Sequence, residues 1–169
     1  VLLDEIEKIE PKKILEIGTC IGYSGSVMLL NSNAYLTTLE INEESAKIAK
    51  DNFEKLGVSQ RVKLLVGDAK DFIDNAKEKF DFIFLDGPKG QYKNYLPKLM
   101  ELIEDEGVIF ADNIYFKGYV NLSENEFLPR GIRTIVRNLR VFNSMVKSNP
   151  ILDSTFLDIG DGICIIKKI

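Results

Sequence analysis

Histidine is absent from the 169-residue sequence, and cysteine occurs only twice. The absence of histidine excludes Ser-His-Asp and Cys-His nucleophilic catalysis, histidine-ligated zinc and histidine general bases. Cys20 and Cys164 lie far apart in the sequence and form no metal-ligand pattern, which is typical of a protein in a reducing cytoplasm. Any acid–base or metal chemistry therefore has to come from Asp, Glu, Asn, Lys or Tyr side chains.

Long apolar runs are also absent: none approaches the roughly 20 residues of a membrane-spanning helix, and no signal-peptide pattern opens the chain. Its length, with 45% hydrophobic and 28% charged residues, is typical of one globular domain over residues 1–169. Val1 already lies in a helical pattern and no Met precedes it, so we expect some N-terminal residues to be missing. We expect a cytoplasmic protein without a membrane partner.

Short apolar segments alternate with helical patterns along most of the chain. Apolar residues on both faces of a segment are typical of strands in a parallel sheet that is covered on both sides. The expected strands are residues 14–17, 35–40, 62–66, 82–85 and 108–111. One helix is expected directly after Asn42, and two further helices are expected over residues 68–76 and 92–103.

The C-terminal part follows a different pattern. Residues 128–146 form a long amphipathic helix pattern, and Gly-Asp-Gly at 160–162 separates two final strands, 155–159 and 163–167. The whole pattern predicts an α/β fold: a Rossmann-like, doubly wound, mostly parallel sheet that ends in an antiparallel hairpin.

A glycine-rich turn in residues 15–25 (LEIGTCIGYSG) joins the first expected strand to a helix. Glycine lets a ligand approach the backbone closely, although the spacing of Gly18 and Gly22 is not that of the dinucleotide fingerprint. Glu40 ends the next strand, where its carboxylate could accept hydrogen bonds from ribose hydroxyls, and Gly-Asp-Ala at 67–69 could meet an adenine. The pattern favours a nucleoside-type ligand; the alternative is an ordinary strand-to-helix turn with a solvated Glu40.

Acidic and amide side chains follow the fourth and fifth expected strands. Asp86 comes directly after one strand, and Asp112 and Asn113 follow the other. Carboxyl ends of neighbouring parallel strands are where open α/β sheets bind ligands, and three hard oxygen ligands suit Mg²⁺. Lys89 could act as a base beside that metal. The alternative is that the two aspartates cap the helices that follow them.

Four of the five arginines lie between residues 130 and 140, although the net charge is −4. Residues 1–113 carry a net charge of −7, and the last 56 residues carry +3. Arginines spaced three, four and three apart align on one helix face, and with Lys117 they could bind RNA phosphates. The alternative is a solvated helix face. The expected RNA-binding residues are Lys117, Arg130, Arg133, Arg137 and Arg140.

Together these residues resemble the class I methyltransferases that use S-adenosylmethionine (SAM), specifically the catechol O-methyltransferase-like family, from about residue 13 to the end. The resemblance implies that Lys89 and Asp86 are catalytic and that Asp86, Asp112 and Asn113 bind the metal. The cofactor-binding residues that it implies are Glu16, Gly18, Gly22, Ser24, Glu40, Asp68, Ala69 and Asp86.

Within that family, residues 86–92 and 113–118 are most similar to the bacterial branch that methylates 5-hydroxyuridine in tRNA, giving 5-methoxyuridine at the anticodon wobble position. The arginine-rich helix, Phe142-Asn143 and the Gly-Asp-Gly at 160–162 are similar as well. The resemblance implies a tRNA partner and a homodimer. Gly87-Pro88 departs from the pattern, since relatives often have small residues such as alanines there.

The chemistry that the resemblance implies is Mg²⁺-assisted O-methylation of a hydroxyl beside a second oxygen. Catechols and 5-hydroxyuracil share this pair of oxygens, so a small-molecule catechol or phenylpropanoid (caffeoyl-CoA-like) O-methyltransferase is the alternative with the same chemistry. A second alternative, from a different class, is a non-catalytic nucleoside- or RNA-binding module.

Overall fold

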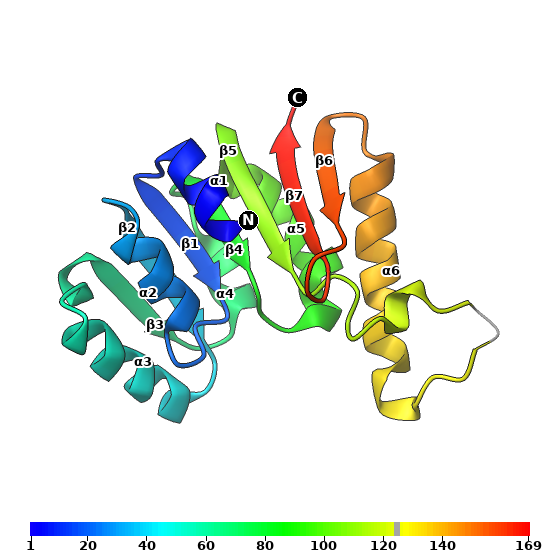
Figure 1. The fold of residues 1–169 in the computed structure, drawn as a ribbon, viewed down its shortest axis with the longest axis horizontal. Helices are drawn as coiled ribbons and strands as arrows, with labels where there is room; N and C mark the ends of the chain where they lie inside the picture. Colours follow the sequence, from blue (N-terminus) through cyan, green and yellow to red (C-terminus); the bar gives the residue numbers. More distant parts are fainter. Residues whose placement is uncertain (124–125) are drawn as a thin grey trace.

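A computed structural model describes residues 1–123 and 126–169 (Figure 1). In these residues seven strands form one sheet in the order β3-β2-β1-β4-β5-β7-β6. Strands β1 to β5 run parallel, whereas β7 is antiparallel to both of its neighbours, β5 and β6. The doubly wound α/β sheet with an antiparallel C-terminal hairpin is thereby confirmed.

Helices and short 3₁₀ turns connect the strands. The strands are β1 (Lys13–Ile17), β2 (Tyr35–Glu40), β3 (Val62–Val66), β4 (Phe80–Leu85), β5 (Ile103–Asp112), β6 (Leu152–Leu157) and β7 (Ile163–Lys168). The helices are α1 (Leu2–Ile9), α2 (Tyr23–Leu30), α3 (Glu43–Lys55), α4 (Ala69–Asn75), α5 (Tyr92–Leu102) and α6 (Arg133–Ser148). The 3₁₀ turns are η1 (Ser59–Arg61), η2 (Lys89–Gln91), η3 (Tyr119–Asn121) and η4 (Arg130–Ile132).

Alternate residues of the strands build two hydrophobic cores, one on each face of the sheet. On β4, Phe82 and Phe84 pack toward α1, α2 and α3, whereas Ile83 and Leu85 pack toward α4, α5 and α6. This arrangement explains why the parallel strands read as continuous apolar runs. It also places the carboxyl ends of β1, β2, β4 and β5 along one edge of the sheet (Figure 1).

Two expected element boundaries in the C-terminal part are wrong. The helix expected from residue 128 begins at Arg133, because Pro129 precedes a 3₁₀ turn, η4, that contains Arg130. The strand expected at 155–159 is β6, Leu152–Leu157; Leu157 pairs with Ile163, so the hairpin loop holds five residues rather than three. No helix in the described residues is long and apolar enough to span a membrane.

Candidate active site

A cavity of about 440 Å³ opens at the carboxyl ends of β1, β2 and β4. Five of the residues expected to bind the cofactor line it: Gly18, Glu40, Asp68, Ala69 and Asp86. Four other lining residues are Cys20, Ile41, Pro88 and Tyr95. The strand-end position and mixed polar and apolar lining are typical of nucleoside pockets in open α/β sheets.

Gly18 allows the glycine-rich turn after β1 to lie against the loop that follows β4. Its φ of +100° lies in the region that favours glycine, and a Cβ at this position would be 2.4 Å from the carbonyl oxygen of Asp86. The Gly18 N–H donates to the carbonyl of Leu39, and the Asp86 N–H donates to that of Ile17. Any side chain at position 18 would push the first glycine-rich turn away from Asp86.

The Glu40 carboxylate is held at the rim of the cavity by backbone donors. The N–H of Cys20 lies 2.7 Å from Oε2, and the N–H of Asn42 lies 2.9 Å from Oε1. Asp68 is the N-cap of α4, and its Oδ1 accepts a hydrogen bond from the N–H of Lys70. Asp68 therefore caps α4 and also lines the cavity.

Glu16, Gly22 and Ser24 lie outside the lining of the cavity. Gly22 begins α2 with a φ of +83°, and a Cβ there would be 3.0 Å from the ring of Phe53. Glu16 is fully buried, and burial raises its pKa to about 8, with further raising by the charges of Asp86 and Glu40. Glu16 is buried and does not line the cavity, and its expected role as a cofactor ligand stays a prediction.

Asp86, Lys89 and Tyr92 form a connected cluster at the end of β4. The Lys89 ammonium group donates to Asp86 Oδ1 and to the Tyr92 hydroxyl oxygen, the latter at 2.9 Å. The Tyr92 hydroxyl lies 2.9 Å from the carbonyl of Leu85 and 3.0 Å from that of Asp112. Burial raises the pKa of Tyr92 well above its usual value, so this hydroxyl stays neutral and ties the tips of β4 and β5 together.

Asp112 and Asn113 lie at the tip of β5, next to Asp86. The strands are in register there, with Leu85 opposite Ala111. Burial raises the pKa of Asp112, the N–H of Asn113 lowers it, and the negative charge of Asp86 raises it again. Asn113 has a left-handed φ of 56°, and its N–H lies 2.7 Å from Asp112 Oδ1. Asp112 and Asn113 cap no helix, because no helix follows β5 directly.

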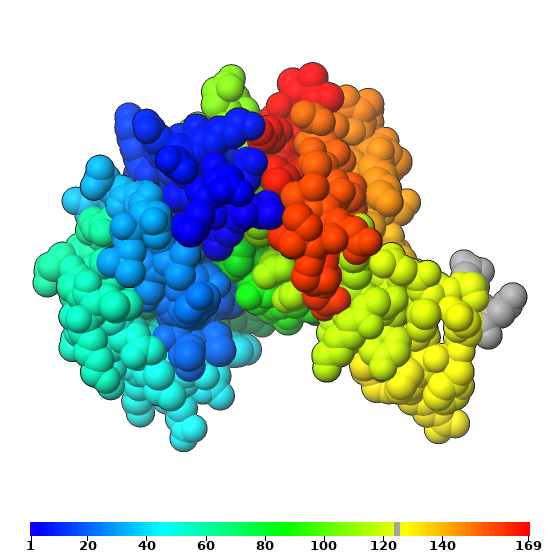
Figure 2. Space-filling model, viewed as in Figure 1, coloured from blue at the N-terminus to red at the C-terminus, as the bar shows by residue number. Residues whose placement is uncertain are grey.

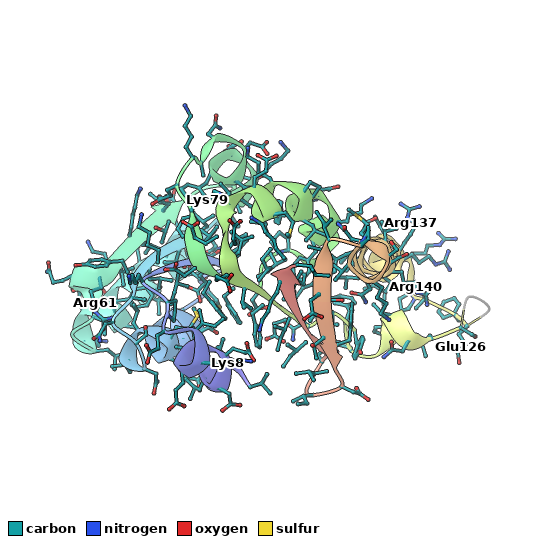
Figure 3. The ribbon with its side chains drawn as sticks, turned by 90° about the horizontal axis from the view of Figure 1, so that it is seen from above. Lys8, Arg61, Lys79, Glu126, Arg137 and Arg140 are labelled. Atoms are coloured by element: carbon teal, nitrogen blue, oxygen red, sulfur yellow. The ribbon has the colours of Figure 1, made fainter. Side chains whose placement is uncertain are left out.

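Three of the four arginines expected to form one stripe lie on α6, and the fourth precedes the helix. Arg133 and Arg137 are exposed on α6 and line a hollow of about 630 Å³, whereas Arg130 lies in η4 and Lys117 in the loop after β5. Figure 3 shows Arg137 and Arg140 on α6, at the opposite end of the molecule from Arg61. Residues 113–123 and 126–132, between β5 and α6, protrude from the body of the molecule in the space-filling view (Figure 2).

Arg140 also lines this hollow, but its guanidinium donates hydrogen bonds to backbone carbonyls of the protein. Its Nε lies 3.1 Å from the carbonyl of Val120, and its terminal nitrogen lies 2.6 Å from that of Leu122. These contacts join α6 to η3. Arg140 therefore has a structural role, and its expected contact with RNA stays a prediction.

The family profile described as O-methyltransferase matches residues 2–169. The chain belongs to the O-methyltransferase family. It is 34% identical over 154 residues to a catechol O-methyltransferase of Niastella koreensis, an alignment that covers 88% of this chain and 67% of that protein. It is 27% identical over 172 residues to a caffeoyl-CoA O-methyltransferase of Stellaria longipes, covering 97% of this chain and 71% of the relative.

Solved structures of methyltransferases share the fold of this O-methyltransferase. The SAH-bound Podospora anserina methyltransferase PaMTH1 superposes with a TM-score of 0.88 at 27% identity, covering 99% of this chain and 76% of that one. An O-methyltransferase from Bacillus cereus in complex with SAH gives 0.85 at 28% identity, covering 99% and 79%. The chain is thus a SAM-dependent O-methyltransferase, and a non-catalytic module is excluded.

Two tyrosines of the O-methyltransferase site were missed from the sequence. Tyr92 ties β4 to β5, and Tyr95, one helical turn later, lines the cofactor cavity. Both resemble ordinary core aromatics, because each is almost fully buried on α5. Their i, i+3 spacing directly after the Asp86–Lys89 loop was the only available signal, since it places both on one helix face.

Proposed function

We propose that this O-methyltransferase moves the methyl group of SAM to a hydroxyl that lies beside a second oxygen, with Mg²⁺ as the resident metal. The convergence of Asp86, Lys89 and Asp112 at two neighbouring strand tips supports this proposal most directly. Asp86 belongs both to the cofactor cavity and to this cluster, so a substrate at the cluster would lie next to the bound cofactor.

The side chains at the strand tips fit a hard divalent cation. Residues 1–123 and 126–169 hold no group of three or more carboxylate, thiol or imidazole side chains that could bind a metal. The proposed ligand set therefore contains only two such side chains, the carboxylates of Asp86 and Asp112, and adds the amide of Asn113. Burial and the charge of Asp86 raise the pKa of Asp112, whereas the nearby charge of Lys89 lowers it. Such a set would leave coordination positions for water and for both substrate oxygens.

The chain's own residues orient the reactants. Lys89 is held by Asp86 and Tyr92. As the free amine it would accept the proton of the substrate hydroxyl, and the ammonium group that results would neutralise the charge of the oxyanion. Tyr92 keeps the two strand tips together and fixes this geometry. When bound, Mg²⁺ would stabilise the substrate oxyanion and align its two oxygens. Holding the oxyanion in line with the methyl group would supply much of the rate acceleration.

The first candidate substrate is 5-hydroxyuridine at the tRNA wobble position. Helix α6 packs on the catalytic loop, because the Asn138 amide donates to the carbonyl of Gly90. The hollow beside Arg133 and Arg137 lies on a different face of the same helix from Asn138, and the exposed ring of Phe127 lies 5.9 Å from the Arg133 guanidinium. Exposed cations and an aromatic ring suit an RNA strand. A cytoplasmic homodimer is part of this proposal.

The second candidate is a small catechol. It is favoured by the 34% identity to the Niastella koreensis catechol O-methyltransferase. Such a substrate would need the strand-tip cluster but not the cations of α6.

A labelling experiment distinguishes the two substrates. Protein, Mg²⁺ and methyl-labelled SAM are incubated with tRNA that carries 5-hydroxyuridine at the wobble position but lacks its methyl group, or with a panel of catechols. We expect label in the tRNA, and a Km for tRNA raised about tenfold or more by the double variant Arg133→Met, Arg137→Met, since each phosphate contact contributes to affinity. Lys79→Met, an exposed cation far from α6, is the control (Figure 3). Label only in catechols, unaffected by the double variant, would contradict the tRNA proposal.

A further inference from the structure

A second hollow on α6 adjoins the one that Arg133 and Arg137 line. This cavity of about 440 Å³, the Asn143 hollow, has a lining that includes Tyr115, Arg140, Asn143, Ser144, Lys147 and Ser148. Arg140 and Ser144 line both hollows, so the two cavities are neighbours along one helix.

The two hollows share one row of cations. Arg133, Arg137, Arg140 and Lys147 are spaced four, three and seven residues apart, which keeps them on one side of α6. From the first to the last of them the helix rises about 21 Å, at 1.5 Å per residue. No Asp or Glu occurs in α6. Glu126 is the one acid among the described residues that line the hollows, and it accepts a hydrogen bond from the N–H of Ser123.

The cations of the Asn143 hollow favour a negatively charged ligand. Arg140 donates to the carbonyls of Val120 and Leu122, which are neutral acceptors and do not cancel its positive charge. The exposed Lys147 ammonium lies 4.5 Å from the centre of the Phe156 ring, a contact that leaves it charged. Cations grouped in this way suit the oxygens of a phosphate.

Asn143 adds a second requirement for the ligand. Its side chain is only 7% exposed, and its amide nitrogen donates to the carbonyl oxygen of Ile114 at 3.3 Å. This bond orients the amide, and Oδ1 is buried with no hydrogen-bond partner among the described residues. Buried amide oxygens in proteins are nearly always paired with a donor. A ligand that fits this hollow should therefore carry a hydroxyl or N–H donor in addition to its negative charge.

We propose that the Asn143 hollow binds one ribonucleotide of a single-stranded RNA segment, with the phosphate at Arg140 and Lys147 and the 2′-hydroxyl donating to Asn143 Oδ1. A ribonucleotide carries both groups that the hollow requires. The inference deepens the proposed tRNA substrate and rests on it for the choice of RNA as the partner.

The continuity of the two hollows favours a strand over a free nucleotide. The phosphates of neighbouring nucleotides in one strand can reach Arg133 and Arg137, which a single nucleotide in the Asn143 hollow does not need. The exposed ring of Phe127, beside Arg133, offers a base a surface for stacking. One side of α6 thus carries the groups that an extended strand uses.

The two contacts in the Asn143 hollow have different consequences for specificity. Lys147 contacts phosphate, which RNA and DNA share, so it contributes affinity without distinguishing them. Asn143 contacts the 2′-hydroxyl, which DNA lacks. One such hydrogen bond corresponds to a preference for RNA of about two- to tenfold.

Oligouridine and oligodeoxyuridine of equal length test the proposal on the wild-type enzyme, because they differ only in the 2′-hydroxyl. Affinities are measured by fluorescence anisotropy of the labelled oligomers at several salt concentrations. We expect oligouridine to bind about two- to tenfold more tightly. Equal affinities for the two oligomers would overturn the proposal. Binding of free uridine monophosphate without binding of either oligomer would also overturn it.

Two variants assign the contacts to their residues. Lys147→Met should weaken both oligomers alike and lower the slope of affinity against salt by about one, whereas the exposed control Lys79→Met should match the wild type. Asn143→Leu should abolish the preference for oligouridine and leave the affinity for oligodeoxyuridine within about twofold. A preference that persists in Asn143→Leu, or equal behaviour of the two lysine variants, would contradict the proposal.

The wild-type comparison and Lys147→Met keep the proposal testable if Asn143→Leu does not fold, because neither changes a buried residue. Labelling of tRNA is a separate readout. If tRNA accepts the methyl group but the two oligomers bind equally, only this inference fails. If tRNA accepts no label and neither oligomer binds, the proposed tRNA substrate fails with it.

Discussion

Gly18 and Asp86 are 68 positions apart in the sequence but in contact at the active site. The carbonyl of Asp86 occupies the space that any Cβ at position 18 would need, and the φ of Gly18 is itself unfavourable for other residues. The same two residues line the cofactor cavity. A single backbone approach therefore determines how the cofactor loop and the catalytic loop are placed relative to each other.

Gly18→Ala should weaken SAH binding by at least tenfold. The new methyl group would have to displace the Asp86 backbone, and left-handed backbone strain costs of order 1–3 kcal/mol in addition. Calorimetric titration with SAH measures the effect. Gly131→Ala is the matched control, because open space surrounds Gly131. Equal affinities for the two variants would show that the loops are not coupled in this way.

Charged residues of the site were easier to predict than aromatic ones. Asp86 and Asp112 were predicted because two carboxylates, together with Asn113, follow neighbouring apolar strands. Tyr92 and Tyr95 were missed because a buried tyrosine matches the core pattern equally well. Glu16 was predicted as a cofactor ligand; its side chain is completely buried, and this role stays a prediction.

At the scale of elements, α6 connects the catalytic loop to the segment that follows β5. Its Asn138 contacts the carbonyl of Gly90 in η2, and its Arg140 contacts carbonyls in and after η3. The opposite side chains of the helix are apolar and pack into the core beside α5. The position of α6 thus depends on both the core and these polar contacts.

Arg140→Met should loosen the segment around η3. Its guanidinium donates to several backbone carbonyls, and losing these charge-assisted hydrogen bonds should lower the free energy of unfolding by about 1–2 kcal/mol. Hydrogen exchange of residues 119–122 should become faster. Arg137→Met is the matched control, since an exposed arginine should change stability by less than about 0.5 kcal/mol. Equal effects in both variants would contradict the structural role of Arg140.

The order of strands and helices was predictable, whereas element ends in the C-terminal part were not. Apolar runs and turn residues indicated the sheet and its final hairpin. The predicted start of α6 was wrong by five residues, because Pro129 precedes a 3₁₀ turn over Arg130–Ile132 and the α-helix begins only at Arg133. The shift of β6 depended on pairing with β7, which periodicity alone does not reveal.

At the scale of the whole molecule, the sheet order brings the cofactor cavity and the proposed metal site to one edge of the sheet. The order β3-β2-β1-β4-β5 places the cofactor cavity at the ends of β1, β2 and β4, and the proposed metal ligands at the ends of β4 and β5. Asp86, at the end of β4, is shared by both sites. The absence of histidine is consistent with this arrangement, because carboxylates, an amide and a lysine supply the groups that the proposed mechanism needs.

The most direct test of this account is the metal dependence of methyl transfer. With the acceptor that takes up label, chelator-treated enzyme should be inactive, and added Mg²⁺ should restore turnover. Asp112→Ala should lower turnover by about 10³-fold or more, since metal stabilisation of the oxyanion is worth several kcal/mol. Its affinity for SAH should stay within about twofold, and Asp153→Ala, an exposed control, should match the wild type. Full turnover by chelator-treated enzyme, or by Asp112→Ala, would contradict the proposed mechanism.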